Sequence, residues 1–143
     1  LQRQLPLALD LVRACPQTTF ILDHCGVPAI ADNNAPSGAG FLAWEKSIRA
    51  LAAEPNVNGK ISGISAYAPA PLRNAPGLRP YTDTMLDAFS PDRLVWGGDW
   101  PVVNLGDGLL AWSTITRELL SGLTADERFQ ILITNAKKIY RIP

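Results

Sequence analysis

Cysteine is scarce in this 143-residue chain: there are two, Cys15 and Cys25. Two cysteines are too few for a disulfide framework, and they lack the paired spacing of a zinc site. Cys15 falls in a helical pattern and Cys25 follows an apolar run, which favours two separate, reduced thiols. Reduced thiols are typical of the cytoplasm, so the sequence predicts a cytoplasmic protein.

Net charge is also lacking, because 13 Lys and Arg residues balance 13 Asp and Glu residues. A nucleic-acid surface or a polybasic membrane patch needs a basic stripe, and none is present. No apolar run approaches the roughly 18–20 residues that span a bilayer. The chain begins at Leu1, with neither Met nor a signal-like stretch. We therefore expect a piece cut from a longer protein that binds neither nucleic acid nor membrane.

Several common catalytic motifs are absent. The sequence has no G-x-G-x-x-G fingerprint, no P-loop, no G-x-S-x-G elbow and no H-E-x-x-H. These absences argue against the commonest nucleotide-binding, esterase and zinc-protease assignments. A hydrophobic content of 47% is nevertheless ordinary for a folded domain.

Helical and strand patterns alternate along the chain. Helical spacing predicts helices over 5–14, 41–53, 80–89 and 109–120, and a last helix that runs to about residue 140. Short apolar runs predict strands over 19–22, 57–61 and 93–96. Pro80 suits the first turn of its helix, and Thr124 with Glu127 forms a capping-box pattern. Alternation of this kind predicts an α/β fold with a parallel sheet, joined by long loops over 27–40 and 64–79.

Polar residues follow each predicted strand. The first strand ends in Asp23-His24, the second carries Lys60-x-Ser62, and the third ends in Gly98-Asp99. Ligands of parallel α/β folds bind at the carboxyl ends of the strands. We therefore expect the functional residues on this rim.

His24 and Asp99 are the strongest candidates for chemistry. His24 is the only histidine, and a lone histidine is more often structural, but it ends an apolar strand beside Asp23. Asp99 follows two glycines, where a bend can expose its carboxylate; the alternative is a turn-capping aspartate. Trp100-Pro101 would place a stiff apolar wall beside it, which can raise a carboxylate's proton affinity or stack on a flat ligand.

Lys60 and Ser62 are two residues apart and so face the same way. A buried lysine needs a carboxylate partner, whereas a lysine on a less buried strand can point outward. In the following loop, Tyr67, Arg73 and Arg79 are able to contact a hydroxylated or anionic substrate, although solvated surface is the commoner role of such residues.

Four segments resemble one known family: residues 20–28 (FILDHCGVP), 56–63 (NVNGKISG), 91–101 (PDRLVWGGDWP) and 135–140 (NAKKIY). Their order and separation are similar to the amidohydrolase-2 branch of the amidohydrolase superfamily. Within this branch the chain most resembles sugar lactonases of the L-fuconolactonase and L-rhamnonolactonase type, with pyrone-dicarboxylate lactonases further off.

The resemblance implies a (β/α)8 barrel, which typically takes about 250 residues. Residues 1–143 would then be a single domain piece, the C-terminal half of the barrel, with strands six to eight and their flanking helices. The H-x-H pair of the family's first strand is missing. Half a barrel leaves two sheet edges open, so we expect either the N-terminal half-barrel or a second copy as partner.

The resemblance also implies a reaction, the hydrolysis of a small sugar lactone or related cyclic ester. Asp99 would be the general base and His24 would stabilise the oxyanion, while Lys60, Ser62, Trp100 and Tyr67 would bind substrate. We expect no cofactor and no catalytic metal; if one divalent ion such as zinc is present, His24 and Asp99 would be its ligands. Two alternatives remain: a metal-dependent hydrolase or decarboxylase of the same branch, and an inactive half-barrel that only folds and self-associates.

Overall fold

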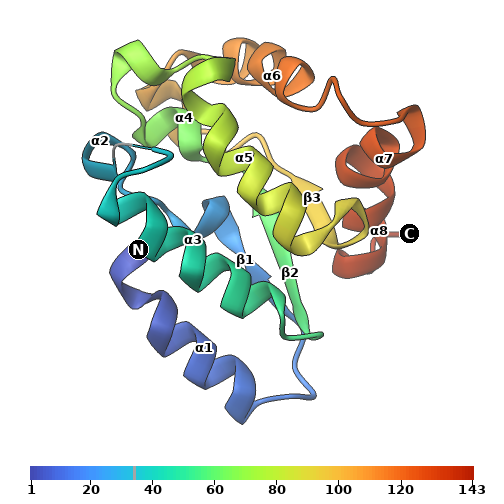
Figure 1. Ribbon diagram of the computed structural model, residues 1–143. Helices are drawn as coiled ribbons and strands as arrows, with labels where there is room; N and C mark the ends of the chain where they lie inside the picture. Colours follow the sequence, from blue (N-terminus) through green and yellow to red (C-terminus); the bar gives the residue numbers. More distant parts are fainter. Residues whose placement is uncertain (34) are drawn as a thin grey trace.

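The computed structural model describes residues 1–33 and 35–143. Three short strands form the sheet: β1 (Phe20–Leu22), β2 (Val57–Ile61) and β3 (Leu94–Trp96). Helices flank it (Figure 1): α1 (Leu5–Ala14), α2 (Ile30–Asn33), α3 (Ala39–Ala52), α4 (Ile64–Tyr67), α5 (Ala75–Phe89), α6 (Gly108–Leu119), α7 (Ala125–Phe129) and α8 (Asn135–Tyr140). A π-helical segment, Gln130–Thr134, joins α7 to α8.

The sheet is parallel, in the order β1-β2-β3. Leu22 is in register with Gly59, and Lys60 is in register with Val95. The predicted α/β fold with parallel strands is therefore confirmed. The carboxyl ends of all three strands lie at the same end of the sheet, as parallel pairing requires.

Strand β2 separates the two faces of the sheet. Val57, Gly59 and Ile61 are buried, whereas Asn58 and Lys60 between them are only half-buried. A Cβ atom at Gly59 would lie 2.7 Å from Met85 Cε and 2.8 Å from Leu94 Cδ2. Helix α5 thus packs against the backbone of β2, and Lys60 is directed to the opposite face.

Helices α3 and α5 lie side by side (Figure 1). Aromatic side chains join them. The Trp44 ring lies 5.3 Å from the Phe41 ring and 5.2 Å from the Tyr81 ring, measured between centroids. All three residues are almost fully buried, so α3 and α5 form one apolar layer on one face of the sheet.

Helix α5 is longer than predicted. It begins at Ala75 rather than at Pro80, because the Asn74 side chain caps it by accepting a hydrogen bond from Gly77 N at 2.9 Å. Pro80 lies inside the helix, so its predicted first-turn position is wrong. The predicted loop over 64–79 also contains α4 and a 3₁₀ turn at Ala70–Leu72.

The capping box is confirmed. Thr124 Oγ1 accepts a hydrogen bond from Glu127 N, and Glu127 Oε2 accepts one from Thr124 N at 2.8 Å. Cys15 and Cys25 are both free thiols, as predicted. Within the described ranges, no helix combines the length and the apolar character that crossing a bilayer demands.

We expect Gly59→Ala to lower the free energy of unfolding by about 1–3 kcal/mol, because its methyl group overpacks the contact with Met85 and Leu94. Urea denaturation followed by circular dichroism measures this change. Gly122→Ala is the matched control, since a Cβ there meets nothing within 4 Å. Equal stability of the two variants would contradict the close packing of α5 on β2.

Candidate active site

His24 lies on a strained turn that follows β1. The backbone of His24 and Cys25 is left-handed, with φ of 54° and 50°, a conformation that costs a non-glycine residue roughly 1–2 kcal/mol. Neighbouring elements hold the turn in place: Trp44 Nε1 donates a hydrogen bond to Cys25 O at 2.9 Å, and Cys25 Sγ lies 3.6 Å from Lys60 O. Burial raises the pKa of Cys25 to about 12, so this thiol stays protonated and is no nucleophile.

Gly63 makes room for the imidazole. It follows β2 with a φ of +70°, and a Cβ there would lie 2.7 Å from His24 Nδ1. Glycine is therefore required here for two reasons: the positive φ disfavours other residues, and there is no room for a Cβ atom. This role of Gly63 was not predicted from the sequence, because a positive φ and a close approach to His24 leave no mark in the strand pattern.

The structure brings His24, Ser62 and Asp99 together from the ends of all three strands. His24 Nδ1 lies 2.9 Å from Ser62 Oγ and 3.7 Å from Asp99 Oδ1. Asp99 follows β3 with a left-handed φ of 54°. Its side chain is 9% exposed, and Asp99 Oδ2 is buried with no hydrogen-bond partner among the described residues. A buried, unpaired carboxylate oxygen is ready to accept a proton or a hydrogen bond from a ligand.

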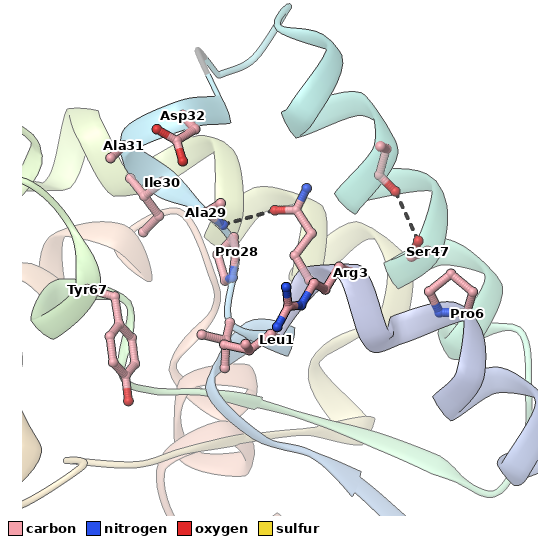
Figure 2. Close-up of a pocket in the computed structure, with 13 residues that line it drawn as sticks. Leu1, Arg3, Pro6, Pro28, Ala29, Ile30, Ala31, Asp32, Ser47 and Tyr67 are labelled. Carbon is pink, nitrogen blue, oxygen red and sulfur yellow. Dashed lines mark hydrogen bonds between the residues drawn. The ribbon is translucent and has the colours of Figure 1, made fainter.

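Tyr67, at the end of α4, lies beside this cluster. Its ring meets the His24 ring edge-on, with centroids 6.4 Å apart. Burial, followed by the negative charge of Asp99, raises the pKa of the Tyr67 hydroxyl. Tyr67 also lines a pocket of about 700 Å³, where Figure 2 shows Tyr67 on one side and Ser47 on the other. Trp100 is 74% exposed, so its indole faces mainly solvent.

Lys60 has the carboxylate partner that a buried strand lysine needs. Lys60 Nζ lies 3.1 Å from Asp23 Oδ1. Burial acts to lower the pKa of Lys60, but the hydrogen bond and negative charge of Asp23, with smaller contributions from Tyr140, outweigh it, and the net pKa is raised. The partner was not singled out from the sequence; the register of Leu22 with Gly59, which sets Asp23 beside Lys60, is the signal that identifies it.

The two loop arginines lie in other contacts. Arg73 Nε donates a hydrogen bond to Ala68 O at 2.9 Å, and Arg73 Nη1 lies 3.7 Å from Asp107. Arg79 Nη2 donates to Glu118 O at 3.3 Å. Both guanidinium groups therefore form contacts that hold neighbouring loops and helices together.

A complete metal site is not formed by this chain's described residues. Among them, no group of three or more His, Cys, Asp or Glu side chains is arranged to hold an ion. His24 and Asp99 offer two ligands at most, and zinc in proteins usually takes at least three. Further ligands would have to come from outside residues 1–33 and 35–143.

Known proteins resemble this chain over nearly its whole length. The sequence profile of the amidohydrolase family matches residues 1–142. The chain is 34% identical to an L-fucono-1,5-lactonase of Burkholderia ambifaria, over 98% of the chain and 47% of that relative. It is 33% identical to an L-fucono-1,5-lactonase of Burkholderia multivorans, over 99% of the chain and 49% of the relative. The chain spans about half the length of the curated relatives it matches.

Solved structures share the fold of this chain. A crystal structure of an amidohydrolase from Burkholderia multivorans with bound zinc matches with a TM-score of 0.88 and 30% identity, over 99% of this chain and 50% of that one. A second crystal structure from that organism, with bound HEPES, matches with a TM-score of 0.89 and 32% identity, over 99% and 51% of the two chains.

The predicted half-barrel is confirmed, because the whole fold superimposes on one half of a barrel enzyme. By its sequence and by its fold, the chain belongs to the amidohydrolase family.

Proposed function

We propose that the barrel to which this half belongs hydrolyses the ester bond of a sugar-acid lactone. The observation that carries the proposal is the unpaired, buried Asp99 Oδ2 beside the His24 ring at the carboxyl ends of the strands. The Burkholderia relatives named L-fucono-1,5-lactonase support a lactone as substrate. A pocket of about 700 Å³, within the range of about 300–1,000 Å³ typical of small-molecule sites, shares Tyr67 with this cluster, although neither His24 nor Asp99 lines it.

Asp99 acts as the general base in this proposal. It takes a proton from a water molecule as the water oxygen attacks the lactone carbonyl carbon, which gives a tetrahedral oxyanion. The oxyanion collapses, the ring C–O bond breaks, and the proton held by Asp99 passes to the leaving alkoxide. The product is the open-chain hydroxy acid, so a carboxylate that is poised to accept a proton is the group the reaction needs.

His24 donates a hydrogen bond from its ring to the carbonyl oxygen, where negative charge develops. One well-placed donor of this kind contributes about 3–4 kcal/mol to transition-state stability. The His24 side chain is 25% exposed, so part of it remains accessible to a ligand while Nδ1 meets Ser62.

Lys60, Tyr67 and Trp100 are the proposed substrate-binding residues. Lys60 carries a charge on the barrel-facing side of β2, and Tyr67 both contacts the His24 ring and lines the pocket. Trp100 offers an exposed ring next to the base, suited to stacking on a sugar face. Ser62 is fully buried, so we assign its influence on substrate to its contact with His24.

A metal-dependent reaction is the second candidate, favoured by the zinc in the Burkholderia multivorans structure. His24 and Asp99 would be this chain's ligands, and residues of the other half would have to supply the rest. A bound divalent ion would activate the attacking water. Asp99 would then orient that water, with its second oxygen free to hold a proton.

We further propose that the partner of this chain is a complementary half-barrel of five strands. Along the described chain, the outer edges of β1 and β3 pair with no other strand. Each open edge is flanked by exposed apolar residues, Leu11 of α1 beside β1 and Leu132 of the π-helical segment beside β3. A second copy would bring the strands to six rather than the eight of a closed barrel.

The base assignment predicts that Asp99→Asn lowers kcat of the intact barrel on L-fucono-1,5-lactone by about 10²–10⁴-fold, because the amide accepts no proton. Initial rates from pH-stat titration of the released acid measure this. Asp107→Asn is the matched control, since Asp107 is half exposed and contacts Arg73. An unchanged kcat in Asp99→Asn would remove Asp99 as the base.

The metal-free mechanism predicts that dialysis against a chelator leaves kcat unchanged within about twofold, because the base and donor belong to the protein. Metal content by mass spectrometry accompanies the assay. A loss of tenfold or more that added zinc restores would establish the second candidate.

The partner proposal predicts a 1:1 complex, seen by light scattering, between this chain and the part of the Burkholderia ambifaria relative that it does not match. Leu11→Lys should weaken the complex at least tenfold, because it places a charge beside the open edge of β1, where the other half would pack. Leu42→Lys is the control, on the outer surface of α3, where Leu42 is 51% exposed. A homodimer that excludes the added half would favour a second copy.

A further inference from the structure

Among His24, Ser62 and Asp99, Ser62 is the one whose side chain no ligand can reach. Its relative exposure is 0%, and it lies directly after β2. In the described part of the chain, the hydrogen-bond partner of its hydroxyl is His24 Nδ1, at 2.9 Å. Whatever Ser62 contributes to the site therefore passes through the imidazole.

The direction of this hydrogen bond follows from what each group must satisfy. If Nδ1 carried a proton and donated it, the buried Ser62 O–H would be left without an acceptor among the described residues. If Ser62 donates to an unprotonated Nδ1, both the hydroxyl hydrogen and the ring lone pair are satisfied. Leaving a buried donor unpaired is the more costly arrangement, so the O–H donates.

Asp99 competes with Ser62 for the same ring nitrogen. Asp99 Oδ1 lies 3.7 Å from His24 Nδ1, beyond hydrogen-bond distance but close enough to take an Nδ1 proton after a small ring movement. A His24 with its proton on Nδ1 would then pair with the carboxylate. That pairing would occupy the proposed base and leave Nε2 without a proton to donate.

We infer that Ser62 is a positioning residue that fixes the neutral His24 ring with its proton on Nε2 and keeps Nδ1 from pairing with Asp99. The hydrogen bond that one ring nitrogen makes decides which nitrogen carries the proton. With Nδ1 satisfied by Ser62, the Nε2–H is the ring's remaining donor and the Asp99 carboxylate keeps its free oxygen. The value of this arrangement to catalysis rests on the proposed function; the arrangement itself does not.

The test uses the fact that His24 is the only histidine in the sequence. A long-range ¹H–¹⁵N spectrum of the ¹⁵N-labelled chain, purified without a histidine tag under alkaline conditions where imidazoles are neutral, shows a single ring. We expect an unprotonated Nδ1 and a protonated Nε2 in the wild type. In Ser62→Ala, with Asp99 the remaining neighbour of Nδ1, the proton shifts to Nδ1.

Ser65→Ala is the matched control. Ser65 is also a buried serine, 4% exposed, and its hydroxyl has no hydrogen-bond partner among the described residues. It should leave the ring spectrum as in the wild type. Ser62→Cys, which retains volume but offers only a weak donor, should give a mixture of the two ring forms. A wild-type ring protonated on Nδ1, or a Ser62→Ala ring that keeps the wild-type form, would overturn the inference.

Activity separates this inference from the proposed function. In the intact barrel we expect Ser62→Ala to lower kcat on L-fucono-1,5-lactone by about 10–100-fold, with KM changed little, because the donor to the oxyanion is lost. The expected ring spectra without lactonase activity in the wild type would uphold the tautomer and reject the proposed function. Activity that survives Ser62→Ala unchanged, despite a shifted proton, would reject the catalytic value of Ser62.

Discussion

A left-handed backbone residue at the end of each strand is the constraint on which the site depends. His24, Gly63 and Asp99 have φ values of 54°, 70° and 54°. At each of these points the chain turns sharply away from its strand. The turns bring the His24 and Asp99 side chains together, and Gly63 leaves room for the imidazole. Two of the three residues carry a Cβ and are strained there, so the surrounding packing must hold them. The Trp44 hydrogen bond to Cys25 O and the tight seat of His24 against Gly63 provide that support.

Regular elements with strong local patterns could be predicted from the sequence. Strand β2 and helix α1 have the expected bounds, because buried apolar residues alternate in one and recur at helical spacing in the other. Helix α5 begins earlier than predicted because Pro80 is a stronger local signal in the sequence than the Asn74 cap. The buried residues Ala75 and Leu78 extend the helix, and their contribution to stability comes from tertiary packing.

The site was predictable as a set of strand ends, but its internal contacts were not. Parallel strands must bring their carboxyl ends to one edge, so the proximity of His24 and Asp99 follows from the alternation of elements. Which groups bind one another depends on register and backbone conformation. Lys60 forms an ion pair with Asp23 rather than with Asp99. The Ser62 hydroxyl forms a hydrogen bond with the His24 imidazole rather than facing a substrate. Neither the register nor a positive φ at a histidine can be read from one sequence.

The shortness of the outer strands limits how strongly the open edges of the sheet can attract other chains. β1 and β3 are three residues long, so each open edge exposes only a few free backbone groups. A long, flat edge would recruit strands from unrelated chains, whereas a short one gives them little to bind. These short edges therefore offer little backbone for amyloid-like growth, and exposed apolar side chains of the flanking helices, such as Leu11, lie beside them.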